Sequence, residues 1–226
     1  MKAVIVVPAF NESPVILKVI RSIPKRLRGV KKTEILLVND GSTDDTGPLA
    51  SRANVQIASH IINRGLGAAI KTGLDWAKSR SADIVVTFDG DGQHDPKDIE
   101  KLIQPILQKK ADIVIGSRFK KKQKIPFDRL FLNWFANFAT FLLFGVFSTD
   151  SQSGLRAFSR KAIELIEFKA DRMEFSSEIL LEAKKHNLKV IEIPTSAIYT
   201  PYSREKGQKN INAIPVFAKF LIRFLR

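Results

Sequence analysis

The sequence predicts an α/β domain built on a doubly wound, mostly parallel β-sheet, and three observations support this fold class. The 226 residues, 44% hydrophobic and 27% charged, suffice for one large globular domain rather than a disordered chain. Short apolar runs alternate with segments whose apolar residues lie three and four positions apart, as strands alternate with amphipathic helices. Polar and acidic residues follow several of these runs. Repeated strand, helix and strand units favour a parallel sheet.

The five predicted strands are the apolar runs AVIVV, EILLV, VQIASHI, DIVVTF and DIVIGS, at residues 3–7, 34–38, 55–61, 83–88 and 112–117. Helices are expected between them, over segments such as SPVILKVIRSIP and LGAAIKTGLDWAKS. The first residues, MKAVIVVPAFNES, lack the length and the cleavage site of a signal peptide, so we interpret them as the first strand. Ligands of such sheets bind beyond the carboxyl ends of the strands. The loops that follow the strands should therefore carry the chemistry.

Charge and composition narrow the classes of partner. The chain has no cysteine, which excludes disulfides, thiolate metal sites and a cysteine nucleophile and fits an intracellular location. Its formal net charge of +14 predicts nucleic acid, anionic lipid or phosphorylated substrates as partners. The basic segments RFKKKQK and FAKFLIRFLR flank very apolar stretches, whereas nucleic-acid binders usually distribute their bases along a polar groove. This placement favours lipid and phosphorylated substrates over nucleic acid.

An acidic loop, DGDGQHD at residues 89–95, follows the fourth predicted strand. Asp89 and Asp91 alternate with glycines, so both carboxylates can turn toward one point, where their repulsion would be relieved by a divalent cation. With two protein carboxylates, Mg²⁺ or Mn²⁺ keeps positions open for the oxygens of a diphosphate. The alternative is an ordinary polar Asp-Gly turn. A dinucleotide fingerprint and a P-loop are excluded, because Ile70 stands where the former needs its third glycine and no GxxxxGK[ST] occurs.

Two segments point to a membrane surface. Residues 130–149 carry no charge and approach the ~20 residues of a membrane span, yet Asn133 and Asn137 suggest one polar stripe. We interpret residues 128–149 as an interfacial helix or helix pair, with a buried core helix or a span as alternatives. Residues 211–226 are predicted to form a basic amphipathic helix after a domain that covers residues 1–210.

Six motifs in order give the chain a family resemblance: VVPAFNE, LLVNDGSTDDT, NRGLGAAIKTG, FDGDGQHDP, IGSRF and SGLRAF. Together they resemble the inverting family 2 glycosyltransferases of the GT-A fold. More narrowly, they are similar to the dolichol-phosphate mannosyltransferase-like branch, which transfers a sugar from a nucleotide-sugar to a polyprenyl phosphate. The resemblance covers residues 3 to about 210. It implies a GT-A sheet with interfacial amphipathic helices towards the C-terminus.

The resemblance also implies roles for individual residues. The loops after the first two strands would hold the nucleoside through Pro8, Phe10, Glu12, Val38 and Asp40. Asp89, Asp91 and Gln93 would hold the metal, and with Gly90 the diphosphate. Arg118 would face the donor or acceptor phosphate, with Arg129 and Arg156 on the acceptor side and Glu178 nearby in a supporting role. The catalytic set would be Asp89, Asp91, Arg118 and Arg204, with Lys209 as a further donor contact.

Two departures from the family pattern concern the donor site. Asn39 stands before Asp40 where the family usually has two aspartates, which affects base or ribose contacts. The usual arginine, two residues, Gly-x-Ser-Lys element appears as REKGQKN at residues 204–210, without serine and with its lysine one place early. Arg204 and Lys209 are still expected to bind phosphate, and a basic surface loop is the alternative.

The implied reaction is an in-line displacement at the anomeric carbon with a nucleoside diphosphate leaving. A phosphate monoester acceptor has a second pKa of about 6 and needs no strong base. Consistent with this, His94 is interpreted as a supporting loop residue, and His60 and His186 as ordinary structural residues. The enzyme is expected on the cytoplasmic face of a membrane, as a peripheral protein with or without a separate membrane-anchoring partner.

Three rival interpretations stay open. A glycosyltransferase with a hydroxyl acceptor would place a carboxylate beside the anomeric carbon. A sugar nucleotidyltransferase would need a glycine-rich first loop with a catalytic, positively charged residue, and PAFNES has neither. A non-catalytic basic protein that binds membranes or nucleic acid would have no need of Asp89 and Asp91.

Overall fold

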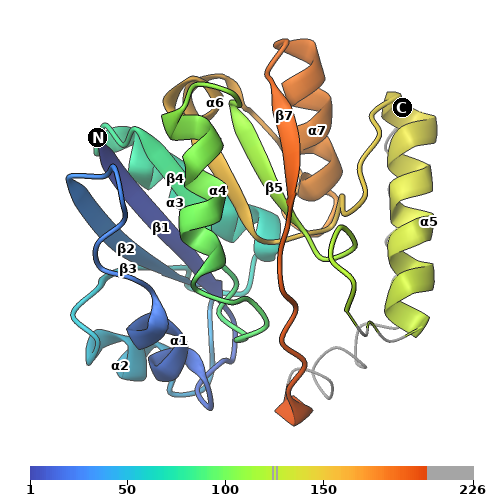
Figure 1. Ribbon diagram of the computed structural model, residues 1–226. Helices are drawn as coiled ribbons and strands as arrows, with labels where there is room; N and C mark the ends of the chain where they lie inside the picture. The colour runs from blue at the N-terminus through green and yellow to red at the C-terminus, as the bar shows by residue number, and fades with distance from the viewer. Residues whose placement is uncertain (124, 126, 203–226) are drawn as a thin grey trace.

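The computed structural model describes residues 1–123, 125 and 127–202, apart from some side chains within residues 127–144 (Figure 1). Arg204, Lys209 and the expected helix at 211–226 lie outside the described residues, as does the side chain of Arg129. The predictions made for these positions stay predictions.

Seven strands form one sheet in the order β3-β2-β1-β4-β6-β5-β7. All neighbours pair in parallel except β6, which is antiparallel to both β4 and β5. The strands are β1 Lys2–Ala9, β2 Lys32–Asn39, β3 Gln56–Ser59, β4 Ile84–Thr87, β5 Ile113–Ser117, β6 Arg156–Ser159 and β7 Val190–Pro194. The doubly wound, mostly parallel sheet is confirmed, and the five predicted strands are β1 to β5. Neither the antiparallel β6 nor β7 was among them.

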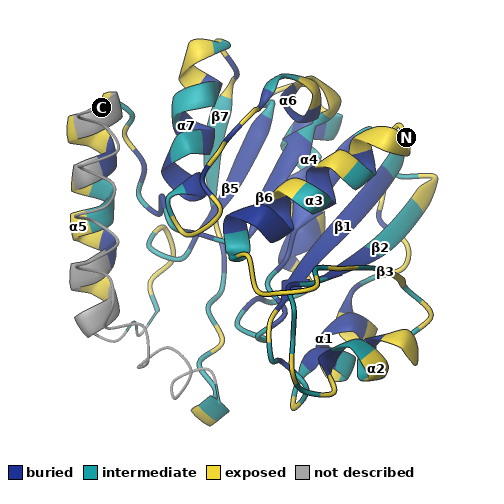
Figure 2. Ribbon diagram, turned by 180° about the vertical axis from the view of Figure 1, so that it is seen from behind, coloured by how far each residue is buried: buried dark blue, intermediate teal, exposed yellow. Residues whose placement is uncertain are grey.

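Helices cover both faces of the sheet, as Figures 1 and 2 show from opposite sides. The helices of the domain are α1 Ile16–Ser22, α2 Thr46–Ser51, α3 Leu66–Ser79, α4 Asp98–Leu107, α5 Phe127–Phe144, α6 Arg160–Leu165 and α7 Phe175–Lys185. Strand residues alternate between two cores: Val4 and Val6 pack with α3, α6 and α7, while Ile5 and Val7 pack with α1 and α4. Strands buried on both faces need continuous apolar runs, which explains the runs in the sequence.

Helix α3 packs closely on β1 because one of its residues is glycine. A methyl group at Gly73 would overlap the side chain of Val6, which lies at 0% exposure in the core. The small residues of LGAAIKTG predicted close packing of this helix on the sheet. The contact of Gly73 with Val6 confirms it.

Helix α5 stands apart from the two helical layers (Figures 1 and 2). Its polar residues Asn133 and Thr140 are buried, whereas Trp134 and Leu142 are 61% and 70% exposed. The described exposures rule out a fully buried core helix, which was one alternative for this segment. Within residues 1–202 as described, no helix is both long and apolar enough to cross a membrane.

Candidate active site

Asp89 lies at the carboxyl end of β4, in the acidic loop, with its side chain 26% exposed. Its Oδ2 lies 3.0 Å from Nε2 of the buried His94. Burial opposes ionisation of Asp89, but the bond with His94 and the charges of His94 and Arg118 outweigh it and lower the pKa of Asp89. Burial likewise opposes protonation of His94, and Asp89 and Asp91 outweigh it and raise the pKa of His94. His94 thus holds a charged carboxylate in place, the supporting role predicted for it.

Asp91 is oriented by the residue two positions later. The backbone N–H of Gln93 donates to its Oδ1 at 2.9 Å, and the Gln93 Nε2 amide donates to Oδ2 at 2.8 Å. Gln93 therefore braces a carboxylate at the position where the sequence predicted a metal contact. The acidic loop is also held by residues that follow β7. Ile198 N donates to the Gln93 carbonyl, and Ala197 forms a β-bridge with His94.

The donor set of this loop fits a divalent cation. Asp89 and Asp91 supply hard carboxylate oxygens, which Mg²⁺ and Mn²⁺ prefer. No cluster of three or more histidine, aspartate or glutamate ligands occurs among the described residues, so these two carboxylates do not form a closed protein cage. A cation held in this way would keep positions for phosphate oxygens.

The back of Asp89 packs against a glycine from a distant loop. A methyl group on Gly154 would overlap both carboxylate oxygens of Asp89. The hydroxyl of Thr87 donates to the Gly154 carbonyl at 2.6 Å and fixes the glycine there. Gly154 lies within the SGLRAF motif, but the sequence alone gave it no role.

The loops after β1 and β2 lie beside each other at the same edge. Glu12 is buried, and its Oε2 accepts a hydrogen bond of 2.7 Å from the Tyr202 hydroxyl. Burial and the charge and hydrogen bond of Glu12 raise the pKa of Tyr202. Phe10 is 38% exposed, whereas Val38 is fully buried, so Val38 can serve a ligand only by shaping the sheet beneath it. Pro8 lies opposite Val38 in the pairing of β1 with β2, one residue before both strands end.

Asp40 is engaged by the loop that follows β3. One carboxylate oxygen lies 2.6 Å from His60 Nδ1 and accepts from Arg64 N, and the other accepts from Gly65 N at 2.8 Å. The second His60 nitrogen lies 2.9 Å from the Thr72 hydroxyl of α3. His60 therefore contacts Asp40, a residue predicted to bind the nucleotide-sugar donor. The sequence did not indicate this contact, because His60 was predicted to be an ordinary strand residue.

Arg118 forms a buried ion pair at the end of β5. Its Nε and a terminal nitrogen each donate to one oxygen of Asp150 at 2.8 Å, and its backbone N–H donates to the same carboxylate at 3.0 Å. Burial alone would lower the pKa of Arg118, but Asp150 outweighs burial and raises it. The Arg118 side chain as a whole is 20% exposed, so it is only partly buried. Asp150 was missed, although it is the first acid after the uncharged stretch 130–149.

Arg156 lies behind the site rather than in it. It is 1% exposed and donates to the backbone carbonyls of Ser151, Ser153 and Ser176 at 2.6 to 3.1 Å. Burial lowers the pKa of Arg156 to about 10, against the attraction of Asp150 and Asp89. This placement makes Arg156 a support of the loop before β6 and leaves it no open path to an acceptor phosphate. Its expected phosphate contact would need that loop to move.

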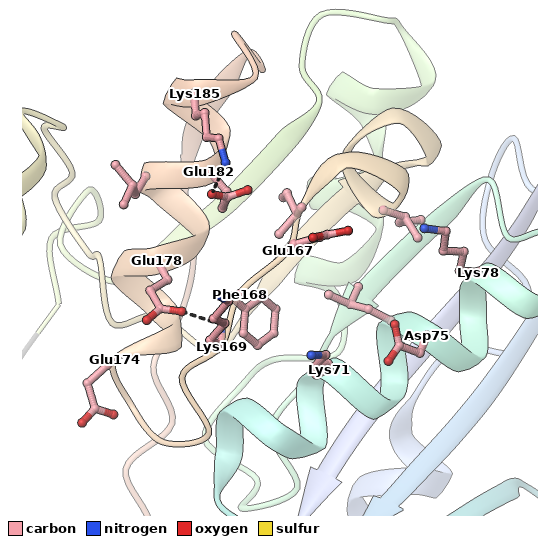
Figure 3. A pocket seen from close by; sticks show the side chains of 14 residues that line it. Lys71, Asp75, Lys78, Glu167, Phe168, Lys169, Glu174, Glu178, Glu182 and Lys185 are labelled. Atoms are coloured by element: carbon pink, nitrogen blue, oxygen red, sulfur yellow. Dashed lines mark hydrogen bonds and ion pairs between the residues drawn. The ribbon is translucent and has the colours of Figure 1, made fainter. Parts of the chain in front are cut away.

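A cavity of about 740 Å³ lies elsewhere, between α3 and α7 (Figure 3). Figure 3 shows Lys71, Asp75 and Glu178 among the residues around it, and none of the acidic-loop residues line it. Glu178 accepts from the backbone N–H groups of Lys169 and Ala170 at 2.8 and 3.0 Å. Glu178 is thus a loop anchor in this structure, away from the carboxylates at the sheet edge.

Comparison with known proteins agrees with this geometry. The model of glycosyl transferase family 2 matches residues 4–166. A UDP-N-acetylglucosamine–dolichyl-phosphate N-acetylglucosaminyltransferase of Methanococcus voltae is 38% identical, over 96% of this chain and 94% of that protein. An undecaprenyl-phosphate mannosyltransferase of Micrococcus luteus is 28% identical, over 94% of this chain and 88% of that protein.

Solved structures show the same fold. Glucosyl-3-phosphoglycerate synthase from Mycobacterium tuberculosis, solved with Mn²⁺, uridine diphosphate and phosphoglyceric acid, superposes with a TM-score of 0.72. The match covers 99% of this chain and 78% of that one at 22% identity. The sheet is therefore of the GT-A type, and the chain belongs to glycosyl transferase family 2, among the relatives of the polyprenyl-phosphate glycosyltransferases.

Proposed function

We propose that this glycosyltransferase moves a sugar from a nucleotide-sugar to a polyprenyl phosphate, with a divalent metal ion, at the cytoplasmic face of a membrane. One observation carries the proposal: the braced carboxylates of Asp89 and Asp91 share the carboxyl edge of a GT-A sheet with the buried Arg118–Asp150 pair. Acids alone would repel a diphosphate, so they need a cation. A fixed arginine beside them suits a second phosphate.

The relatives support a nucleotide-sugar donor and a lipid phosphate acceptor. The archaeal relative at 38% identity is named for UDP-N-acetylglucosamine and dolichyl phosphate, and others at 28–29% are named for mannose transfer to polyprenyl or dolichol phosphates. Between GDP-mannose and a UDP-sugar, the higher identity favours a UDP-sugar.

Mechanistically, the chain's own residues position the two reactants. Glu12 and Asp40 lie where the nucleoside would sit, and Asp89 and Asp91 would hold the cation, which neutralises charge on the departing diphosphate. Arg118 would bind the attacking phosphate and is kept in place by Asp150. An acceptor phosphate that is already dianionic needs no general base, so the mechanism asks of His94 only that it hold Asp89. A hydroxyl acceptor would require a general base.

Donor binding tests the first half of the proposal. A ligand present at a hundred times its dissociation constant adds roughly 2.7 kcal/mol to stability, which raises the unfolding midpoint of such a chain by about 5 to 11 °C, since each 1 kcal/mol contributes about 2 to 4 °C. We expect this rise with Mn²⁺ plus one class of nucleotide-sugar, and with neither alone. The measurement is thermal unfolding with UDP- and GDP-sugars, with and without Mn²⁺. A rise that is independent of Mn²⁺ would contradict the metal-dependent site.

Helix α5 supports the membrane part of the proposal. Its exposed apolar side chains follow a spacing of one helical face: Leu130, Trp134, Phe138, Phe141 and Leu142. Lys120, Lys121 and Lys122 are exposed just before this helix and suit anionic headgroups. An apolar face edged with lysine is typical of a helix that lies in the membrane interface. Residues 211–226, outside the described residues, are a second expected contact.

Replacing Trp134 and Leu142 together by glutamate is expected to lower vesicle binding at least about tenfold, because each buried apolar side chain contributes about 1.5–3 kcal/mol. The measurement is flotation of the full chain with vesicles of phosphatidylcholine and phosphatidylglycerol. Ile61→Glu with Ile62→Glu is the matched control, since these residues are 100% and 69% exposed on the loop after β3. Equal binding of both double variants would contradict an α5 membrane face.

A further inference from the structure

Helix α5 is attached to the domain by hydrogen bonds to residues 148–154, here called the 148–154 loop, and by Thr140, whose hydroxyl lies 3.0 Å from that of Ser177 in α7. Asn133 and Asn137 both donate through Nδ2 to the Thr149 carbonyl, at 3.0 and 2.8 Å. Asn137 alone also accepts through Oδ1 from Ser151 N, at 2.9 Å. The two asparagines therefore face the protein while the apolar face of the same helix points outward.

The 148–154 loop also carries the partners of two site residues. Asp150, which holds Arg118 by two bonds of 2.8 Å, lies between the two residues that Asn137 binds. Four positions later, Gly154 packs on the carboxylate of Asp89. A shift of α5 along its axis would therefore pull on the backbone immediately on both sides of Asp150.

The start of the loop is tied to β7, so the bond of Asn137 to Ser151 is the contact through which such a shift can reach Asp150. Glu192 of β7 accepts from Ser148 Oγ, Thr149 N and Thr149 Oγ1 at 2.6 to 2.8 Å. Ser151 is fully buried, so losing Asn137 leaves its N–H without that partner in a dry place. Losing Asn133 has a smaller cost, because Asn137 still satisfies the Thr149 carbonyl.

We propose that Asn137 is a positioning residue through which the seating of α5 on a lipid surface sets the Arg118–Asp150 pair for the acceptor phosphate. The inference rests on the proposed function and adds a regulatory property to it: the enzyme is faster with a lipid surface present, even when its acceptor is soluble in water. Asn137 itself contacts no reactant.

The test uses the full chain, its nucleotide-sugar donor and a short-chain, water-soluble prenyl phosphate, with and without vesicles of phosphatidylcholine and phosphatidylglycerol. We expect vesicles to stimulate the wild type. Asn137→Ala should lower kcat/KM for the acceptor about tenfold, remove the stimulation by vesicles, and leave vesicle flotation and the donor KM unchanged. Asn133→Ala, the matched control on the same helix, should keep most of the stimulation.

The outcomes separate this inference from the proposed function. If the wild type transfers no sugar to any prenyl phosphate, the proposed function fails. If the wild type is active but vesicles do not stimulate it, or stimulate Asn137→Ala equally, the inference fails and the proposed function stands. Should Asn137→Ala not fold, Asn137→Ser provides the same comparison, and equal stimulation in that variant overturns the inference.

Discussion

Asp91→Asn is expected to reduce metal-dependent sugar transfer by about 10³-fold or more while the chain stays folded. The substitution keeps the shape of the side chain but removes the negative charge that a hard divalent cation requires. In the wild type, the backbone and side-chain N–H groups of Gln93 donate to the two carboxylate oxygens of Asp91. Asparagine keeps only one of these two acceptor oxygens. Initial rates at saturating Mn²⁺, with the unfolding midpoint recorded in parallel, measure the effect.

Asp95→Asn is the control for Asp91→Asn. Asp95 belongs to the same acidic loop, and its carboxylate accepts from Lys97 N at 3.0 Å in a turn that continues into α4. Its neutralisation should change the rate less than about threefold, because the asparagine side-chain oxygen can still accept the hydrogen bond from Lys97 N. Comparable losses in both variants would mean that general loop charge, and not a metal site at Asp91, supports the reaction.

Gly154→Ala is expected to weaken Mn²⁺ binding and to slow transfer about 10²-fold, although Gly154 contacts no reactant. The added methyl group would overlap both oxygens of Asp89, so the carboxylate must leave the position in which His94 holds it. Misplacing a group by about 1 Å can cost 10²-fold in rate. Titration of the donor complex with Mn²⁺ measures the change in affinity.

Gly47→Ala controls for the general effect of removing a glycine. Gly47 lies within α2, and the nearest atom to an added methyl group is the side-chain nitrogen of Asn39, at 3.0 Å. That flexible neighbour can move, and alanine favours a helix. We expect normal Mn²⁺ affinity for Gly47→Ala. An unchanged affinity in Gly154→Ala would show that Asp89 is not the ligand whose position matters.

The sheet could be predicted because its strands are buried on both faces and therefore leave unbroken apolar runs in the sequence. Strand β6 was not predicted from the sequence, and the reason is physical. It has four residues and begins with Arg156, whose buried guanidinium donates to two carbonyls of the loop before β6 and to the Ser176 carbonyl of α7. No local sequence pattern predicts that backbone carbonyls will accept the hydrogen bonds of a buried arginine.

The acidic residues of the candidate site could be predicted from the sequence, whereas most of the residues that contact the site residues could not. Asp89 and Asp91 stand directly after an apolar run, and the position alone indicated a ligand edge. Asp150 lies 32 positions from Arg118 and Tyr202 lies 190 positions from Glu12, so their contacts depend on how distant segments fold together. The polar stripe of α5 was visible in Asn133 and Asn137, but its attachment to the 148–154 loop was not.

Sugar transfer to a polyprenyl phosphate is the reaction to measure directly. The purified chain would be given a radiolabelled UDP- or GDP-sugar, Mn²⁺, and either a polyprenyl phosphate or the corresponding polyprenol in phosphatidylcholine vesicles, and the lipid fraction would be counted. We expect Mn²⁺-dependent label in the lipid phosphate, none in the polyprenol, and loss of the label in Asp91→Asn. Label in the polyprenol, or equal label with Mn²⁺ removed by a chelator, would contradict metal-assisted transfer to a phosphate.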